Sequence, residues 1–387
     1  MNNLMQAFGF EMPTRIEYGI GAVSRLIVEL RHLKAEKIVI VTDKGILKAG
    51  LVDKVTGLLD QSGIRYKIFD DVDPNPKDYN VAAGAELVRE FDAQAIVALG
   101  GGSPIDCAKS IGVLVSHGGT QIKVYEGKTA VHKPILPLIT IPTTSGTGSE
   151  VTFSSVINDT ENNYKMTVKS PLMAAKVALI DPELTLTMPP SVTAATGVDA
   201  LTHAIEAYTA KVSEPISDAL ALYAIELISK NLRTAVYQGN NLEARAGMLV
   251  GSLLAGIAFS HSDVASVHCI AEALGGMYDT PHGVCNAILL PYVMEYNMEY
   301  CIDRYANVAK MMGAQFICME DGAKKAVEMV KQLTVDVKLP SFRSLGIALN
   351  DFDVLAENSA RNISTESNPR PMKKEDYLTV LNKAYEN

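Results

Sequence analysis

The sequence predicts an α/β domain followed by an all-helical domain within a chain of 387 residues. Three observations predict this division. Short apolar runs of strand length alternate with helix-period segments in the first half. The strand signal then fades beyond the segment "DPELTLTMPPSVTAATG". The segments that follow carry apolar residues at helical spacing. We therefore expect an α/β domain over residues 1–185 and a helical domain over residues 186–387.

Four apolar segments of the first half have the length of strands: "KIVIVTD" (37–43), "YKIFDDV" (66–72), "AQAIVALGG" (93–101) and "PILPLITIP" (134–142). Helix-period segments separate the first three. Nearly continuous apolar strands that alternate with helices indicate βαβ units and a parallel sheet covered on both faces. Ligands of such sheets bind at the carboxyl ends of the strands.

The second half contains four clear helical patterns, at residues 217–238, 243–259, 302–313 and 319–335. Its most apolar run, "AGMLVGSLLAGIAF" (246–259), is too short to span a bilayer and is predicted to be a buried helix.

The composition is that of a globular protein, with 48% hydrophobic and 20% charged residues. A formal net charge of −9 and the lack of a Lys/Arg cluster argue against nucleic-acid binding. The five cysteines form no CxxC pair, so neither a disulfide framework nor a cysteine zinc site is indicated. No signal peptide or membrane segment is visible, and we expect a soluble cytoplasmic protein.

Three predicted strand ends carry residues suited to a dinucleotide. Asp43 ends the first strand, where its carboxylate could accept the ribose hydroxyls of an adenosine or could simply cap the next helix. In "ALGGGSPIDCAKSIG", a buried strand runs into Gly100, Gly101 and Gly102, and Ser103 and Pro104 then open a helix. The amides of that first helical turn suit a pyrophosphate, although a tight turn would need the same glycines.

The segment "IPTTSGTGSEVT" repeats this arrangement after the last predicted strand. Hydroxyl groups come from Thr143, Thr144, Ser145 and Thr147, and the intervening glycines give clearance. Two polar, glycine-bearing turns on successive strand ends, together with Asp43, favour a nucleotide site over simple turns.

The helical half contains an aspartate and a histidine four residues apart in "GVDALTHAIEAY". Asp199 and His203 therefore lie on one face of a helix, as half of a metal site or as a hydrogen-bonded pair in a core. Further histidines occur at His268, on a predicted helix, and at His282, in a Pro-His-Gly turn. Spacing alone does not show that they converge, and a core histidine that makes its own hydrogen bonds remains the alternative for His268.

These motifs resemble the iron-containing (group III) alcohol dehydrogenases, in the same order and over essentially the whole chain. The asparagine of "DPNP" and the lysine of "YKMTV" belong to the same resemblance. It implies a dehydroquinate synthase-like plan, in which a Rossmann-like N-terminal domain and an all-α C-terminal domain hold a divalent metal in the cleft between them. The implied metal ligands are Asp199, His203, His268 and His282. The implied contacts to NAD are Asp43, Asn75, Gly102, Ser103, Thr143, Thr144, Thr147 and Lys165.

The implied activity is hydride transfer between NAD(H) and a small primary alcohol or diol and its aldehyde, in a homo-oligomer. Three imidazoles and one carboxylate suit iron(II) or zinc, and we expect iron. No single catalytic residue is assigned. The alternative is a sugar-phosphate cyclase of the dehydroquinate synthase type, which also uses NAD and a metal. Such an enzyme needs several Lys and Arg around its phosphorylated substrate, and the segments that flank the implied ligands contain none.

Two positions depart from the family pattern. Glu272 stands one turn after His268, where the family often has a histidine, and His261 stands where an asparagine is common. Glu272 could orient a ligand imidazole or relay a proton. Glu206, three residues after His203, is a further candidate for orienting a ligand.

Overall fold

The computed structural model describes residues 7–162 and 164–386, and its contacts divide the chain into two compact units. The first, here called the α/β unit, comprises Glu11–Thr144 and Ser149–Met188. The second, here called the helical unit, comprises Met1–Phe10, Ser145–Gly148 and Pro189–Asn387. The short segment Ser145–Gly148, which follows the last predicted strand, therefore belongs with the helices.

The α/β unit contains a six-stranded parallel sheet with strand order β1-β8-β5-β4-β2-β3. Its strands are β1 (Arg15–Tyr18), β2 (Lys37–Val41), β3 (Arg65–Phe69), β4 (Ala95–Gly100), β5 (Leu138–Pro142) and β8 (Val177–Ile180). The four predicted strands correspond to β2, β3, β4 and β5, and the predicted α/β class is confirmed. Strands β1 and β8 were not predicted. The prediction was also wrong in extending β3 to residue 72, because two aspartates follow Phe69 and aspartate is disfavoured in strands.

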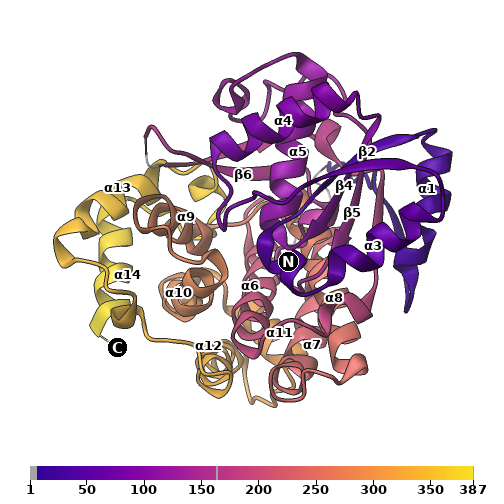
Figure 1. The fold of residues 1–387 in the computed structure, drawn as a ribbon. Coiled ribbons are helices and arrows are strands. Elements are labelled where there is room, and N and C mark those ends of the chain that lie inside the picture. Colours follow the sequence, from indigo (N-terminus) through magenta and orange to yellow (C-terminus); the bar gives the residue numbers. More distant parts are fainter. Residues whose placement is uncertain (1–6, 163, 387) are drawn as a thin grey trace. The chain divides into compact units, whose positions relative to one another are not determined.

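Buried apolar side chains cover both faces of this sheet. Figure 1 shows helices on both sides of the sheet. Along β2, Val39 and Val41 pack on the side of α4 and α5, whereas Ile38 and Ile40 pack on the side of α1 and α3. This alternation is why β2 is apolar throughout. The helices are α1 (Leu26–His32), α2 (Lys44–Lys48), α3 (Leu51–Asp60), α4 (Asp78–Phe91) and α5 (Gly102–His117).

An antiparallel hairpin also belongs to the α/β unit and was not predicted. It consists of β6 (Ser154–Asp159) and β7 (Tyr164–Lys169). Short 3₁₀ turns complete the unit: η1 (Ala22–Arg25), η2 (Ile122–Tyr125), η3 (Ser149–Val151), η4 (Pro171–Met173) and η5 (Pro182–Thr185).

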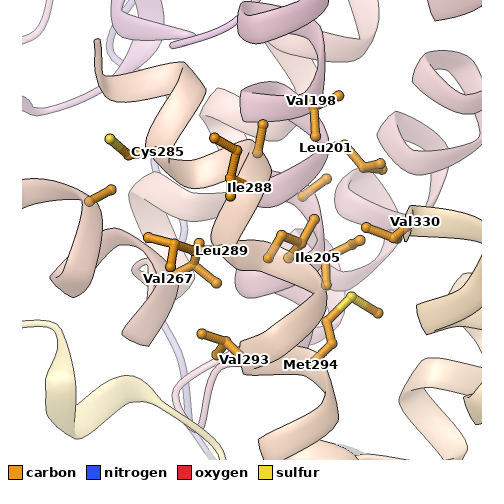
Figure 2. Packing of buried hydrophobic residues seen from close by; sticks show 14 of the residues in the cluster. Val198, Leu201, Ile205, Val267, Cys285, Ile288, Leu289, Val293, Met294 and Val330 are labelled. Carbon is orange, nitrogen blue, oxygen red and sulfur yellow. The ribbon is translucent and has the colours of Figure 1, made fainter. Parts of the chain in front are cut away.

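The helical unit is built around α6, whose residues from Gly197 to Thr209 are all buried. Figure 2 shows Val198, Leu201 and Ile205 of α6 among apolar side chains of α9, α10 and α12. The helices are α6 (Pro190–Thr209), α7 (Pro215–Tyr237), α8 (Leu242–Ser262), α9 (Ser266–Tyr278), α10 (His282–Asn297), α11 (Ile302–Met311), α12 (Met319–Asp336), α13 (Phe352–Arg361) and α14 (Lys374–Glu386). Between them lie the 3₁₀ turns η6 (Met298–Tyr300), η7 (Phe342–Leu345), η8 (Leu349–Asp351) and η9 (Thr365–Ser367).

Helix α8 is longer than the apolar run that predicted it. By length and composition it is the one helix in residues 7–162 and 164–386 that could cross a membrane. However, 61% of its most apolar window is buried inside the protein. A core helix passes the same test of length and composition, and the buried share of α8 fits that explanation.

One glycine fixes how the segment Ser145–Gly148 meets α8. Gly148 has φ +58°, and a Cβ atom there would lie 2.6 Å from the Cα of Gly256. Both the left-handed backbone and this contact with a neighbouring backbone require glycine. The segment thus passes directly over α8.

Candidate metal centre and cofactor-binding edge

The buried helix α6 carries the first two candidate metal ligands. Asp199 and His203 are 1% and 4% exposed and lie one turn apart on the same face. The Nδ1 atom of His203 is 4.0 Å from Oδ2 of Asp199, which is too far for a hydrogen bond. The ring of His203 stacks on Phe259 of α8, with the ring centroids 4.5 Å apart. Asp199 and His203 therefore do not form the hydrogen-bonded core pair that was the alternative.

Two other helices bring His268 and His282 to the same place. His268 lies in the first turn of α9, and His282 is the first residue of α10. One ligand atom from each of these histidines, from His203 and from Asp199 lies within 4.8 Å of the others. Such a group could hold a metal ion, and three imidazoles with one carboxylate suit iron(II) or zinc.

The side chain of His268 shows why this group is suited to an ion. Its Nδ1 atom is hydrogen-bonded to Glu206, whereas its Nε2 atom is buried and has no hydrogen-bond partner in the part of the chain described. Buried polar atoms are nearly always paired, so an unpaired imidazole nitrogen inside a ligand cluster needs an explanation. A metal ion bound at Nε2 provides one.

Glu206 holds this imidazole in place. Its Oε2 atom accepts hydrogen bonds from Nδ1 of His268, at 2.6 Å, and from the backbone N–H of Ala265, at 2.9 Å. Its Oε1 atom accepts from the backbone N–H of Val267, at 2.7 Å. One carboxylate of α6 thus fixes both the start of α9 and the ring orientation of His268, which is how carboxylates commonly support a histidine ligand.

The electrostatics of the two buried histidines differ. Burial, reinforced by the nearby His268, lowers the pKa of His203 well below its usual value, so His203 is held neutral. For His268, burial also lowers the pKa, but the hydrogen bond and charge of Glu206 outweigh it and the pKa is raised. Asp199 and Glu272 add to this increase.

Asn286 supports the other two candidate ligands. Its Nδ2 atom donates to Oδ1 of Asp199 at 2.7 Å and lies 3.0 Å from Nε2 of His282. Asn286 was not predicted from the sequence. Its spacing of four residues from His282 on α10 was the signal that could have found it.

The two residues that depart from the family pattern also have defined contacts. Oε2 of Glu272 accepts a hydrogen bond from Nδ2 of Asn362, at 2.6 Å. The ring of His261 stacks on Phe10 with centroids 4.0 Å apart, and its Nδ1 atom lies 2.8 Å from the carbonyl oxygen of Ile257.

In the α/β unit, the predicted cofactor residues lie at the carboxyl ends of neighbouring strands. Asp43 follows β2, Gly101 follows β4, and Thr143 follows β5, and these strands are adjacent in the sheet. The backbone N–H of Thr143 donates to the carbonyl oxygen of Gly100, which holds the β4 and β5 ends together. The hydroxyl of Thr143 is buried, with no hydrogen-bond partner among the residues that the structure describes.

The structure shows the helix caps that were one explanation for the polar strand ends. Oδ1 of Asp43 accepts from the backbone N–H of Ile46 at 2.9 Å, so Asp43 does cap α2. Gly101 is the cap of α5, which begins with Gly102 and Ser103. A Cβ atom on Gly101 would lie 3.1 Å from the side chain of Thr144. A helix cap and a nucleotide contact are compatible, and the contact to a cofactor stays a prediction.

The remaining predicted residues fall in two places. Nζ of Lys165, on β7, donates to Oδ1 of Asn75 at 2.8 Å, and Asn75 lies beyond the carboxyl end of β3. The structure therefore pairs two residues that are far apart in the sequence. Ser145 and Thr147 belong to the segment that is grouped with the helical unit.

Comparisons with known proteins give one consistent family. Residues 13–182 match the family model described as "Iron-containing alcohol dehydrogenase", and residues 193–385 match "Fe-containing alcohol dehydrogenase family, C-terminal". The chain is 40% identical to the 1,3-propanediol dehydrogenase of Klebsiella pneumoniae, over 98% of this chain and 99% of that protein. It is 35% identical to the NAD-dependent methanol dehydrogenase of Bacillus methanolicus, over 97% and 99%.

The fold agrees with solved structures. An alcohol dehydrogenase from Oenococcus oeni superposes with a TM-score of 0.95 and 39% identity, over 98% of this chain and 100% of that chain.

The role of Glu206 leads to a prediction about metal binding. Glu206→Gln should weaken iron(II) affinity by about 10–100-fold, because an NH₂ group, which only donates, replaces one of the two oxygens that accept from three N–H groups. Affinity would be measured by competition with a chelator, with metal content determined by mass spectrometry. Glu226→Gln, an exposed change on α7, is the matched control and should bind iron like the wild type. Wild-type affinity in Glu206→Gln would contradict the role given to this carboxylate.

Proposed function

The chain belongs to the iron-containing alcohol dehydrogenases, a family of oxidoreductases that use NAD(H) and a divalent metal, and we propose that it reduces small aldehydes with NADH and oxidises the corresponding alcohols with NAD. The substrates proposed are small primary alcohols or diols. The observation that carries the proposal is the group of Asp199, His203, His268 and His282, of which the first three are buried and in which Nε2 of His268 has no partner among the described residues.

These four side chains would hold the metal, iron(II) for preference and zinc as the alternative. When bound, the metal would supply Lewis-acid polarisation of the alcohol or aldehyde oxygen, and NAD(H) would supply the hydride chemistry. The protein supplies positioning. Glu206 and Asn286 orient the ligands, and Phe259 covers one face of the His203 ring.

The α/β unit would bind NAD(H) along the carboxyl ends of its strands. We propose that Asp43 accepts the adenosine ribose hydroxyls and that the first turn of α5, from Gly101 to Ser103, faces the pyrophosphate. The hydroxyls of Thr143 and Thr144 and the Lys165–Asn75 pair would contact the rest of the dinucleotide. Ser145 and Thr147 complete the proposed set.

The sugar-phosphate cyclase is not favoured, because the relatives are alcohol dehydrogenases. The absence of Lys and Arg from the segments that flank the candidate ligands agrees with this. We further propose a cytoplasmic homo-oligomer that binds neither nucleic acid nor membrane. The net charge of −9 and the lack of a basic cluster support the exclusion of nucleic acid.

The direct test is metal-dependent hydride transfer. Removal of the metal should lower the rate of NADH oxidation by small aldehydes about 100-fold or more, since Lewis-acid polarisation supplies several kcal/mol of transition-state stabilisation. Iron(II) or zinc would then be added back, and the absorbance of the reduced nicotinamide followed with a panel of aldehydes. NADH binding, measured on the same metal-free sample, should be largely retained, because the proposed cofactor residues lie mainly in the α/β unit. Full activity without metal would refute the assignment.

Asp43 should determine the choice between NAD(H) and NADP(H). Its carboxylate would repel a 2′-phosphate, so the wild type should prefer NADH. Asp43→Gly should reduce the preference for NADH over NADPH in kcat/KM. Asp43→Ser is the sharper variant, because serine keeps the cap of α2 while removing the charge. The ratio of kcat/KM for NADH to that for NADPH measures the effect. A wild type that uses NADPH better would overturn this role.

Glu272 is proposed to orient a metal ligand or a substrate hydroxyl rather than to relay a proton, since Asn362 already uses one of its oxygens as an acceptor. Glu272→Gln should therefore weaken metal retention or change substrate preference, by about 10–100-fold. Asn362→Ala is the matched control, because it keeps the Glu272 carboxylate and removes only the amide that donates a hydrogen bond to it. The relay would be supported instead if Glu272→Gln kept its metal and lost an ionisation from the pH–rate profile.

A further inference from the structure

Lys109 of α5 is a fully buried lysine that the proposed chemistry does not use. Its side chain is 0% exposed inside the α/β unit. Its Nζ atom donates to the hydroxyl of Ser149 at 3.0 Å, to the hydroxyl of Thr152 at 2.8 Å and to the carbonyl oxygen of Ser154 at 2.8 Å. An ammonium group has three protons, so all of its donors are satisfied by one stretch of chain.

Asp106, one turn earlier on α5, binds the same stretch. Its Oδ1 atom accepts from the hydroxyl of Ser149, and its Oδ2 atom accepts from the backbone N–H of Val156 at 3.0 Å. Its backbone oxygen accepts from the hydroxyl of Ser155 at 2.7 Å. Asp106 and Lys109 together therefore fasten the chain from Ser149 to Val156 to the side of α5.

Stability alone does not explain this network. Burial lowers the pKa of Lys109 to about 8, although Asp106 and Glu150 partly offset the effect. Burial also raises the pKa of Asp106 and brings that of Glu150 to about 7. In addition, Oε1 of Glu150 is buried with no hydrogen-bond partner in the described part of the chain. Apolar side chains of similar size often stabilise a fold at least as well as such buried charges.

The fastened segment leads directly to a pair of proposed cofactor contacts. Ser154 to Val156 form the start of β6, which pairs with β7. Asn158 of β6 lies opposite Lys165 of β7, and the backbone N–H of Asn158 donates to the carbonyl oxygen of Pro76 at 2.8 Å. Lys165 in turn donates to Asn75. The position of the Lys165–Asn75 pair thus depends on how the hairpin is held on α5.

We propose that Asp106 and Lys109 are positioning residues for NAD(H) binding, because they hold the β6–β7 hairpin and its Lys165–Asn75 pair against the helix that begins at Gly102. The inference rests on the proposed function. On this proposal α5 has two functions. Its first turn faces the pyrophosphate, and its residues Asp106 and Lys109 hold the hairpin.

The test is Lys109→Met, which keeps the length of the side chain and removes its charge and donors. The dissociation constant for NADH should rise about 10-fold or more, because small displacements of binding groups have effects of this size or larger. The midpoint of thermal unfolding should fall, because methionine removes the cation beside Asp106 and the donor to the three acceptors of Lys109, so NADH binding is measured well below that midpoint. Lys123→Met is the matched control, since Lys123 is an exposed lysine of the same unit that pairs with Glu161. It should bind NADH like the wild type.

The pH dependence adds a readout that a purely structural role would not change. Above about pH 8, Lys109 loses its proton and one of its donors, so NADH affinity of the wild type should weaken there. Titration of Lys109 itself does not unfold the protein. The folded pKa of Lys109 lies below the usual value of 10.5, so this group makes the fold more stable as pH rises between the two values. Lys109→Met should lack this loss of affinity.

The outcomes separate the inference from the proposed function. If the wild type neither binds NADH nor reduces aldehydes, the proposed function fails. If the wild type does both, and Lys109→Met binds NADH with unchanged affinity and unchanged pH dependence, the positioning role is refuted. If Lys109→Met does not fold, Thr152→Val removes one acceptor of Lys109 instead. Weaker NADH binding in Thr152→Val at unchanged stability would support the inference, and unchanged binding would overturn it.

Discussion

The hydrogen bonds of the Glu206 carboxylate are the interaction on which the metal centre depends. Glu206 lies on α6, the same helix as Asp199 and His203, and it accepts from His268 and from two backbone N–H groups at the start of α9. A buried carboxylate is costly unless it is fully hydrogen-bonded, and here the backbone of α9 and an imidazole do this. In consequence, one helix sets the positions of three of the four candidate ligands, and Asn286 connects the fourth to Asp199.

The α/β unit uses buried charge in a comparable way. Lys109 and Asp106 hold a loop and a hairpin to α5 through hydrogen bonds to side chains and backbone groups. In both units, a buried acidic or basic side chain holds the elements that carry a proposed site. An apolar core could hold the same elements together, but it would fix their register and orientation less closely. We regard this division between apolar packing and polar positioning as the main feature of the protein.

The sequence predicted most of the apolar strands and helices because their pattern is local, although the short apolar strand β8 was missed. Strand β2 is apolar on both faces and was recognised for that reason, whereas β1, with the sequence "RIEY", carries charged residues at an edge of the sheet. The hairpin β6–β7 contains polar side chains whose partners lie on α5, so no local pattern indicated it. Asp199 and His203 were recognised from their spacing on one helix. The convergence of His268 and His282 on them depends on the packing of three helices, and only the family resemblance indicated it. The hydrogen bonds of Lys109 could not be predicted from spacing, because its acceptors in Ser149, Thr152 and Ser154 lie 40, 43 and 45 residues away in the sequence.

The most direct measurement is anomalous X-ray scattering from crystals of the iron-loaded protein, with data collected on both sides of the iron absorption edge. A single strong anomalous peak within bonding distance of Asp199, His203, His268 and His282, with Nε2 of His268 directed at it, is the predicted result. A peak elsewhere, or no peak at this group in protein that contains iron and is active, would contradict the account of the metal centre.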